Sequence, residues 1–187
     1  MDENIKTSTA ISKIKELIGF IALTAIIVLP IRFFIAQPFI VNGSSMSPTF
    51  ETGQYLIVDQ LSYKFNEPVR GDVIIFRYPG NPKIFYIKRI IGLPGETIKI
   101  NGTVVTITNN ENPSGLNLVE PFIAFPLESF LEKKLADNEY FVLGDNRAGS
   151  SDSRVWGPLK KDLIVGKAFV RLWPFNRISY LPGKFTL

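Results

Sequence analysis

The sequence predicts a mainly β protein, in which an antiparallel β-sheet domain follows one N-terminal transmembrane α-helix. The helix is predicted from residues 17–36, an apolar run whose only charge is Arg32 near one end. About 20 residues of helix extend roughly 30 Å, enough to cross a bilayer. The β domain is predicted because apolar residues after position 38 come in short runs broken by Gly, Pro and Asn, the pattern of strands joined by turns.

Residues 1–16 are predicted to form a short cytoplasmic tail, and residues 17–36 the anchor itself. The tail holds three lysines against three acidic residues, so its charge does not orient the anchor. The alternative is a secretory signal cleaved after Ala36, which would put Phe34 at the third position before the cut. That position requires a small residue. We therefore expect an uncleaved anchor.

The rest of the chain, residues 37–187, has room for one domain. Runs rich in Val, Ile, Phe and Tyr predict eight strands, at residues 39–41, 55–58, 73–78, 84–91, 97–100, 104–108, 140–143 and 164–172. Asn101-Gly102, between two of them, predicts a two-residue hairpin turn. Residues 127–135 are the one helical candidate in this part of the sequence. Residues 109–138 are richer in Asn, Pro and acidic groups and predict a lid or insertion, with an ordinary surface loop as the alternative.

The composition narrows the chemistry that is open to this chain. There is no histidine and no cysteine, and most zinc and transition-metal sites depend on those side chains, so no metal and no cofactor are expected. A serine nucleophile would have to use a lysine as its base. The net charge is +4, but the basic residues are scattered and no DNA-binding motif accompanies them, so a nucleic-acid partner is not expected.

Ser45 lies on a predicted bend just after the apolar segment. Gly43 precedes it and lets the backbone turn sharply, and Pro48 stiffens the exit. A hydroxyl on such a bend points away from its own strand, although turn statistics alone favour a plain loop. Met46 is unexpected in an exposed turn, and its thioether is predicted to pack into an apolar surface and orient the turn.

Lys88 lies within a nearly continuous apolar stretch, residues 84–91. Strand alternation would point Lys88 and Arg89 to opposite faces, so one of them must face a mostly apolar side. Burial disfavours an ammonium ion and lowers its pKa, which a lysine base needs at neutral pH. The alternative is an edge-strand lysine in water.

Residues 144–154 form a dense polar segment after the predicted strand 140–143. They include four charged residues, three serines and two glycines. The glycine spacing is that of a phosphate-binding loop, but Ser150 stands where the required lysine would be, so we reject nucleotide binding. The segment is either a solvated loop or a hydrogen-bonded platform that aligns a neighbouring catalytic group.

Four segments, in this order behind the anchor, resemble those of the bacterial type I signal peptidases, the membrane-bound Ser-Lys proteases that remove signal peptides from exported proteins. They are SMSPT (45–49), RGDVIIF (70–76), KRIIGLPGE (88–96) and GDNR through Ser150, Asp152, Ser153 and Arg154. The resemblance covers nearly the whole chain. It implies a catalytic β domain of the type shared with self-cleaving repressors.

The resemblance also implies roles for individual residues. Ser45 is then the nucleophile and Lys88 the base, with Ser150 hydrogen-bonded to the amine. Asp145 with Arg89, and Asp152 with Arg154, would form the surrounding polar scaffold. Some members place a serine two residues before the nucleophile to bind the oxyanion; Gly43 stands there in this chain, as in many members with short N-termini, which leaves the Ser45 N–H as the main donor.

The family's biology supplies the expected partners and location. The domain would lie outside the cytoplasm on the plasma (inner) membrane, or on the thylakoid membrane where the source has one. Its partners would be signal peptides of secretory preproteins cut after Ala-x-Ala, the lipid bilayer and the nearby export translocon. The apolar strands and Met46 would form shallow pockets that face substrate and membrane, while Phe39 and Val41 would pair with the substrate as an added strand.

Two other functions fit parts of the sequence. A self-cleaving repressor would need a helix-turn-helix, where this chain has an apolar segment. A catalytically inactive, membrane-anchored β domain that binds peptides or proteins would be favoured by a Lys88 amine that is fully solvated and far from Ser45.

Overall fold

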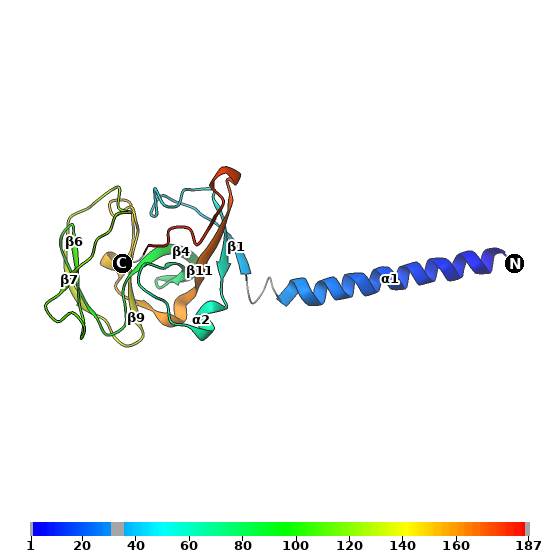
Figure 1. Cartoon of the computed structure of the whole chain (residues 1–187), viewed down its shortest axis with the longest axis horizontal. Helices are drawn as coiled ribbons and strands as arrows, with labels where there is room; N and C mark the ends of the chain where they lie inside the picture. The colour runs from blue at the N-terminus through cyan, green and yellow to red at the C-terminus, as the bar shows by residue number, and fades with distance from the viewer. Residues whose placement is uncertain (1, 31–35, 186–187) are drawn as a thin grey trace.

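Two antiparallel sheets and one long N-terminal helix make up the computed structural model, which describes residues 2–30 and 36–185 (Figure 1). The helices are α1 (Asp2–Pro30), α2 (Ser62–Phe65) and α3 (Ser153–Trp156), with 3-10 turns η2 (Lys161–Leu163) and η3 (Phe175–Arg177). The strands are β1 (Ala36–Ile40), β2 (Tyr55–Asp59), β3 (Val73–Tyr78), β4 (Asn81–Gly92), β5 (Thr97–Gly102), β6 (Val104–Thr108), β7 (Leu116–Asn117), β8 (Ser129–Lys134), β9 (Glu139–Leu143), β10 (Leu159–Lys160), β11 (Ile164–Trp173) and β12 (Ser179–Tyr180). The mainly β, antiparallel prediction is confirmed, and each of the eight predicted runs overlaps a strand.

The larger sheet runs in the order β1-β2-β11-β3-β4-β9-β10, with β12 paired to β11. The smaller sheet has the order β7-β6-β5-β8. β3 is buried on both faces of the larger sheet, because Val73 and Ile75 enter one apolar cluster while Ile74 and Phe76 enter another. Such burial explains why the strand reads as a continuous apolar run rather than an alternating one.

The N-terminal helix α1 covers the predicted tail and most of the predicted anchor. Within residues 2–30 and 36–185, no helix combines the length and hydropathy that a membrane span requires. Residues 31–35, the last part of the predicted anchor and the location of Arg32 and Phe34, lie outside the described residues. The anchor at 17–36 therefore stays a prediction.

The predicted helix at residues 127–135 is wrong, since this segment forms strand β8. β8 pairs with β5 from Ser129 opposite Gly102 to Lys134 opposite Thr97, and the buried Leu135 joins the core of the smaller sheet. The local helical pattern is too short to resist this long-range pairing.

The β5–β6 hairpin forms, with its turn one residue later than predicted. Asn101 still pairs with Val104, so the turn residues are Gly102 and Thr103. Gly102 has φ +64°, a conformation that glycine adopts without steric strain.

Residues 109–138 are a packed part of the domain. They supply β7 and β8 to the smaller sheet, and Phe122 and Leu135 to its core. The structure therefore does not match the plain surface loop considered as the alternative.

Candidate active site

The turn that carries Ser45 is fastened at both ends. Gly43 has φ +98°, so the predicted sharp bend is present at a residue that tolerates this backbone conformation. The Gly43 N–H donates to Thr52 Oγ1 at 3.1 Å, and the Thr52 hydroxyl lies at the same distance from the Gly43 carbonyl. Ser47 N–H donates to the Ser44 carbonyl at 3.0 Å and closes the turn around Ser45.

Met46 anchors this turn to the hydrophobic core of the larger sheet. Its side chain is only 1% exposed and packs in a cluster that includes Val41, Phe50 and Leu56. The expected packing into an apolar surface is present, but the predicted place in a pocket that faces substrate and membrane is wrong. The reason is that the thioether points into the core, away from the cavity beside Ser45.

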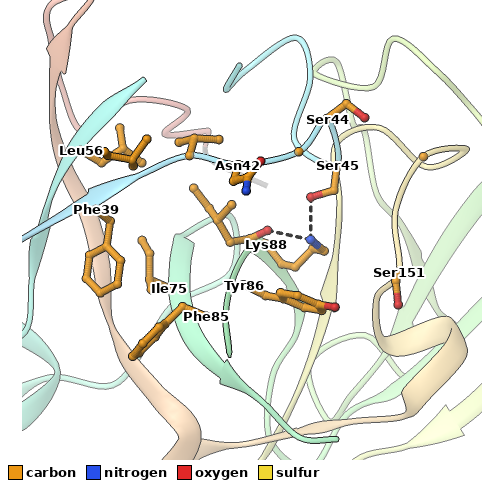
Figure 2. A pocket seen from close by; sticks show the side chains of 15 residues that line it. Phe39, Asn42, Ser44, Ser45, Leu56, Ile75, Phe85, Tyr86, Lys88 and Ser151 are labelled. Atoms are coloured by element: carbon orange, nitrogen blue, oxygen red, sulfur yellow. Dashed lines mark hydrogen bonds between the residues drawn. The ribbon is translucent and has the colours of Figure 1, made fainter. Parts of the chain in front are cut away.

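Lys88 reaches Ser45 from the neighbouring strand β4. Its Nζ lies 2.7 Å from Ser45 Oγ and donates a second hydrogen bond to the Ile87 carbonyl at 2.9 Å (Figure 2). The Lys88 side chain is buried, and so is that of Arg89 next to it. The edge-strand lysine in water, which the sequence left open, does not occur.

Burial sets the proton affinity of this amine. It lowers the pKa of Lys88 from 10.5 to about 8, against the opposing effect of the Asp152 and Asp145 carboxylates. The Tyr86 ring covers the amine, with Nζ 5.2 Å from the ring centroid. A hydroxyl therefore lies in hydrogen-bonding contact with an amine that is partly neutral near pH 7.

The polar segment 144–154 holds the Ser45 turn from the other side. Asn146 N–H donates to the Ser45 carbonyl at 3.1 Å, and Asn146 Nδ2 donates to the Ser44 carbonyl at the same distance. Gly144 permits this approach, because a Cβ there would clash with the Ser45 carbonyl oxygen and with Ser150 Oγ. Sequence reasoning did not single out Asn146; the signal available was an amide within a segment already interpreted as a hydrogen-bonded platform.

Arg89 and Asp145 form the first of the two expected ion pairs. Arg89 Nε and Nη2 donate to the two Asp145 carboxylate oxygens at 2.8 and 2.6 Å, and both side chains are fully buried. Thr49 Oγ1, four residues after Ser45, donates to Asp145 at 2.6 Å. The pair therefore ties β4 to both the Ser45 turn and the polar segment.

Asp152 and Arg154 form the second pair, with Nε to Oδ1 at 2.8 Å. Asp152 also accepts the Gly144 N–H at 3.1 Å and caps the N-terminus of α3 by accepting the Arg154 N–H. The two pairs thus brace the polar segment at its start and at its end.

Ser150 is adjacent to the site but does not make the expected contact. Its Oγ is buried and has no hydrogen-bond partner among the described residues. The predicted hydrogen bond to the Lys88 amine is absent, since Nζ donates to Ser45 and to the Ile87 carbonyl instead.

A cavity of about 400 Å³ opens beside the Ser45–Lys88 contact (Figure 2). Phe39 and Val41 line it together with the β4 residues Phe85 to Lys88, and their role in binding substrate stays a prediction. The remaining lining residues are Ile40, Asn42, Gly43, Ser44, Ser45, Leu56, Ile75, Gly149 and Ser151. No residue of 109–138 lines this cavity, so the segment does not cover it in this conformation.

Two strand edges next to the cavity lack a partner strand. Among residues 2–30 and 36–185, β1 pairs only with β2. β4 pairs with β9 only from Arg89 onward, which leaves its residues 81–88 paired on the β3 side alone within the part of the chain that the structure describes. Across these described residues, no group of three or more carboxylate, imidazole or thiolate side chains is placed to hold a metal ion.

Comparison with known proteins places these residues within a family. A family model described as signal peptidase, peptidase S26, matches residues 14–173. Signal peptidase I of Leptolyngbya laminosa is 39% identical over 178 residues, which cover 91% of this chain and 85% of that protein. A probable signal peptidase I-1 of Synechocystis sp. is 37% identical, covering 92% of this chain and 89% of the relative. A crystal structure of a signal peptidase I from Enterococcus faecalis superposes with a TM-score of 0.44 at 30% identity, over 55% of this chain and 97% of the other.

Proposed function

This chain belongs to the signal peptidase family, peptidase S26, and we propose that it cleaves the signal peptides of exported preproteins with Ser45 as nucleophile and Lys88 as general base. The observation that carries the proposal is the 2.7 Å contact between Lys88 Nζ and Ser45 Oγ, made by a lysine residue that is only 3% exposed. The peptide-binding alternative required a solvated Lys88 far from Ser45, so this contact favours the enzyme.

The proposed reaction begins when neutral Lys88 takes the Ser45 proton. Ser45 Oγ attacks the scissile carbonyl carbon and forms a tetrahedral intermediate. The protonated Lys88 then gives its proton to the leaving amine, and an acyl-enzyme remains on Ser45. Lys88 next deprotonates a water molecule, which attacks the ester carbonyl carbon. The bond to Ser45 Oγ then breaks, the protonated Lys88 returns its proton to Ser45 Oγ, and the signal peptide leaves as a carboxylic acid.

The backbone N–H of Ser45 is the proposed main donor to the oxyanion. It makes no hydrogen bond within the described part of the chain, so it is available to the substrate. Gly43 carries no side chain that could add a second donor. The Asn146 contacts to the Ser44 and Ser45 carbonyls hold this backbone still, which is what preorganised stabilisation of a developing charge requires.

The substrate is proposed to bind as an extended strand between residues 39–43 and the unpaired edge of β4. Edge N–H and C=O groups supply the main-chain hydrogen bonds in this mode of recognition, and alternate substrate side chains enter pockets. Phe39, Phe85 and Ile75 line the apolar part of the cavity (Figure 2), where we propose that the small apolar side chains of an Ala-x-Ala junction bind.

The domain is proposed to work at the outer face of the plasma membrane, or of a thylakoid membrane, with residues 17–36 as its anchor and the export translocon nearby. Ile40, Tyr55 and Trp173 lie side by side on β1, β2 and β11, and they are 60%, 41% and 49% exposed. Because Ile40 also lines the cavity, this apolar row would place the site at the bilayer surface.

The test is cleavage of a preprotein with an Ala-x-Ala junction by the full chain in detergent, beside Ser45→Ala and Lys88→Ala. Each variant is expected to lose on the order of 10³-fold or more in kcat, with similar losses because the two residues act as a unit. Lys99→Ala, which removes an exposed lysine of the smaller sheet, is the matched control and should cleave normally. Cleavage by Ser45→Ala would overturn the proposal.

A further inference from the structure

Four aromatic rings form one packed group behind the Lys88 amine. Tyr86 stacks on Tyr78, with ring centroids 4.7 Å apart, and meets Phe76 edge-on at 6.2 Å. Trp156 contacts both supporting rings, at 5.8 Å from Phe76 and 6.1 Å from Tyr78. Tyr86 is the member that faces Lys88 Nζ, at 5.2 Å from its ring centroid. The other three rings therefore hold the ring that covers the amine.

Trp156 is the one member that does not come from the β3–β4 pair. It is the last residue of α3, whose N-terminus is capped by Asp152. Asp152 accepts the N–H of Gly144 at 3.1 Å, and Gly144 is packed against the Ser45 carbonyl. A single short segment thus connects the turn of the nucleophile to the aromatic group around the base.

The indole of Trp156 is kept in this position without a polar contact. Its Nε1 is buried and has no hydrogen-bond partner in the described residues, an arrangement that disfavours the folded state. A phenylalanine would fill much of the same space without this penalty. The Trp156 side chain therefore contributes to the structure by packing against Phe76 and Tyr78.

The balance between the charged and neutral forms of the Lys88 amine depends on that packing. The charged groups facing the amine are Asp145 and Asp152, which favour the ammonium form, while burial favours the neutral amine. Each carboxylate is already paired, with Arg89 and Arg154 respectively. On β4 the Tyr86 side chain lies over the amine, and Ser45 lies on the side that faces the cavity. Water that entered behind Tyr86 would solvate the ammonium ion and shift this balance.

We propose that Trp156 is a positioning residue, which acts through Tyr78 and Phe76 to hold Tyr86 over Lys88 and so keep water from the amine. The proposal rests on the proposed function, in that Lys88 must be the base for the effect to appear in catalysis. Trp156 itself touches neither Ser45 nor the cavity.

The first test is the pH dependence of kcat/KM for preprotein cleavage by the full chain in detergent. In Trp156→Ala the acidic limb is expected to move to higher pH by about one unit, which lowers activity about tenfold at pH 7 and restores it at higher pH. Trp156→Phe should keep the wild-type limb. Phe169→Ala, which removes the edge-to-face contact with Tyr180 at 5.1 Å, should lower stability without moving the limb.

The second test reads the amine directly, by NMR titration of the Lys88 Cε resonance in the isotopically labelled full chain. An increase in the pKa of Lys88 in Trp156→Ala supports the proposal, and an unchanged pKa together with an unchanged acidic limb overturns it. Should Trp156→Ala fail to fold, Tyr78→Leu removes the same support and is expected to shift the limb in the same direction. Lys88→Ala distinguishes the proposed function from the role of Trp156. Full activity of Lys88→Ala would contradict the proposed function. An acidic limb that does not move in Trp156→Ala would contradict only the role of Trp156.

Discussion

Replacing the Lys88 amine with an apolar side chain of similar length is expected to stabilise the fold at neutral pH while it abolishes cleavage. Burial lowers the pKa of Lys88 from 10.5 to about 8 in the folded chain, and the unfolded chain keeps the ordinary value. At pH 7 both states are mostly protonated, so the folded chain holds an ammonium ion that its surroundings disfavour. A pKa difference of about 2.5 corresponds to about 3 kcal/mol.

The hydrogen bonds of the amine act in the opposite direction. Nζ donates to Ser45 Oγ at 2.7 Å and to the Ile87 carbonyl at 2.9 Å, and each bond contributes about 1 kcal/mol. The net gain in the free energy of unfolding for Lys88→Met at pH 7 is therefore about 1 kcal/mol.

The sign of this effect reverses with pH. Between pH 8 and 10.5 the unfolded chain binds more protons at this site than the folded chain, so wild-type stability rises with pH across this window. The advantage of Lys88→Met is largest below pH 8 and is lost at about pH 9, once wild-type stability has risen by about 1 kcal/mol. Wild-type stability continues to rise toward the upper end of the window. There the missing hydrogen bonds leave the variant the less stable protein.

Guanidinium denaturation in detergent, followed by tryptophan fluorescence at several pH values between 7 and 10, measures the difference. Lys99→Met is the matched control, because the Lys99 side chain is 59% exposed and its replacement should change little. A Lys88→Met chain that is less stable than wild type at pH 7, or a stability difference that stays constant with pH, would show that burial of the Lys88 ammonium does not destabilise the fold.

Three further substitutions test the packing around the site. Gly144→Ala should lower kcat/KM on the order of 100-fold, because the added Cβ displaces the Ser45 carbonyl that it would meet; unchanged kinetics would contradict this account. Arg89→Leu should lower the free energy of unfolding by about 3–5 kcal/mol in denaturation experiments, because it leaves Asp145 buried without its partner, and adding Asp145→Asn should recover part of the loss. Met46→Ala should lower the free energy of unfolding by about 2–5 kcal/mol, because the side chain is buried in the core, and a loss below about 1 kcal/mol would argue that the turn is held by other contacts.

Local patterns were enough to predict most of the sheet and the central pair of the site. Runs such as 73–78 consist largely of β-branched and aromatic residues and are bounded by turn residues. This local composition is enough to predict a strand. The absence of histidine, together with one lysine in an apolar strand and one serine on a glycine bend, pointed to the two residues that the structure places in contact.

The errors come from interactions between distant parts of the chain. Residues 127–135 have a helical pattern locally, but they form a strand because they pair with β5, about 30 residues earlier in the sequence. The direction of the Met46 side chain depends on a core assembled from β2, β3 and β11. The hydrogen bond from Asn146 to the Ser44 carbonyl joins groups about 100 residues apart in the sequence, so no local pattern predicts it.

The role of Lys88 as the base is tested most directly by changing the chemistry of its amine. The chain has no cysteine, so Lys88→Cys introduces a single thiol that 2-bromoethylamine converts to a lysine analogue with a thioether in its side chain and a lower amine pKa. We expect that Lys88→Cys is inactive, that aminoethylation restores preprotein cleavage, and that the acidic limb of the restored activity lies at lower pH than in the wild type. Failure to restore cleavage, or restored cleavage with the acidic limb unmoved, would contradict the assignment of Lys88 as the base that activates Ser45.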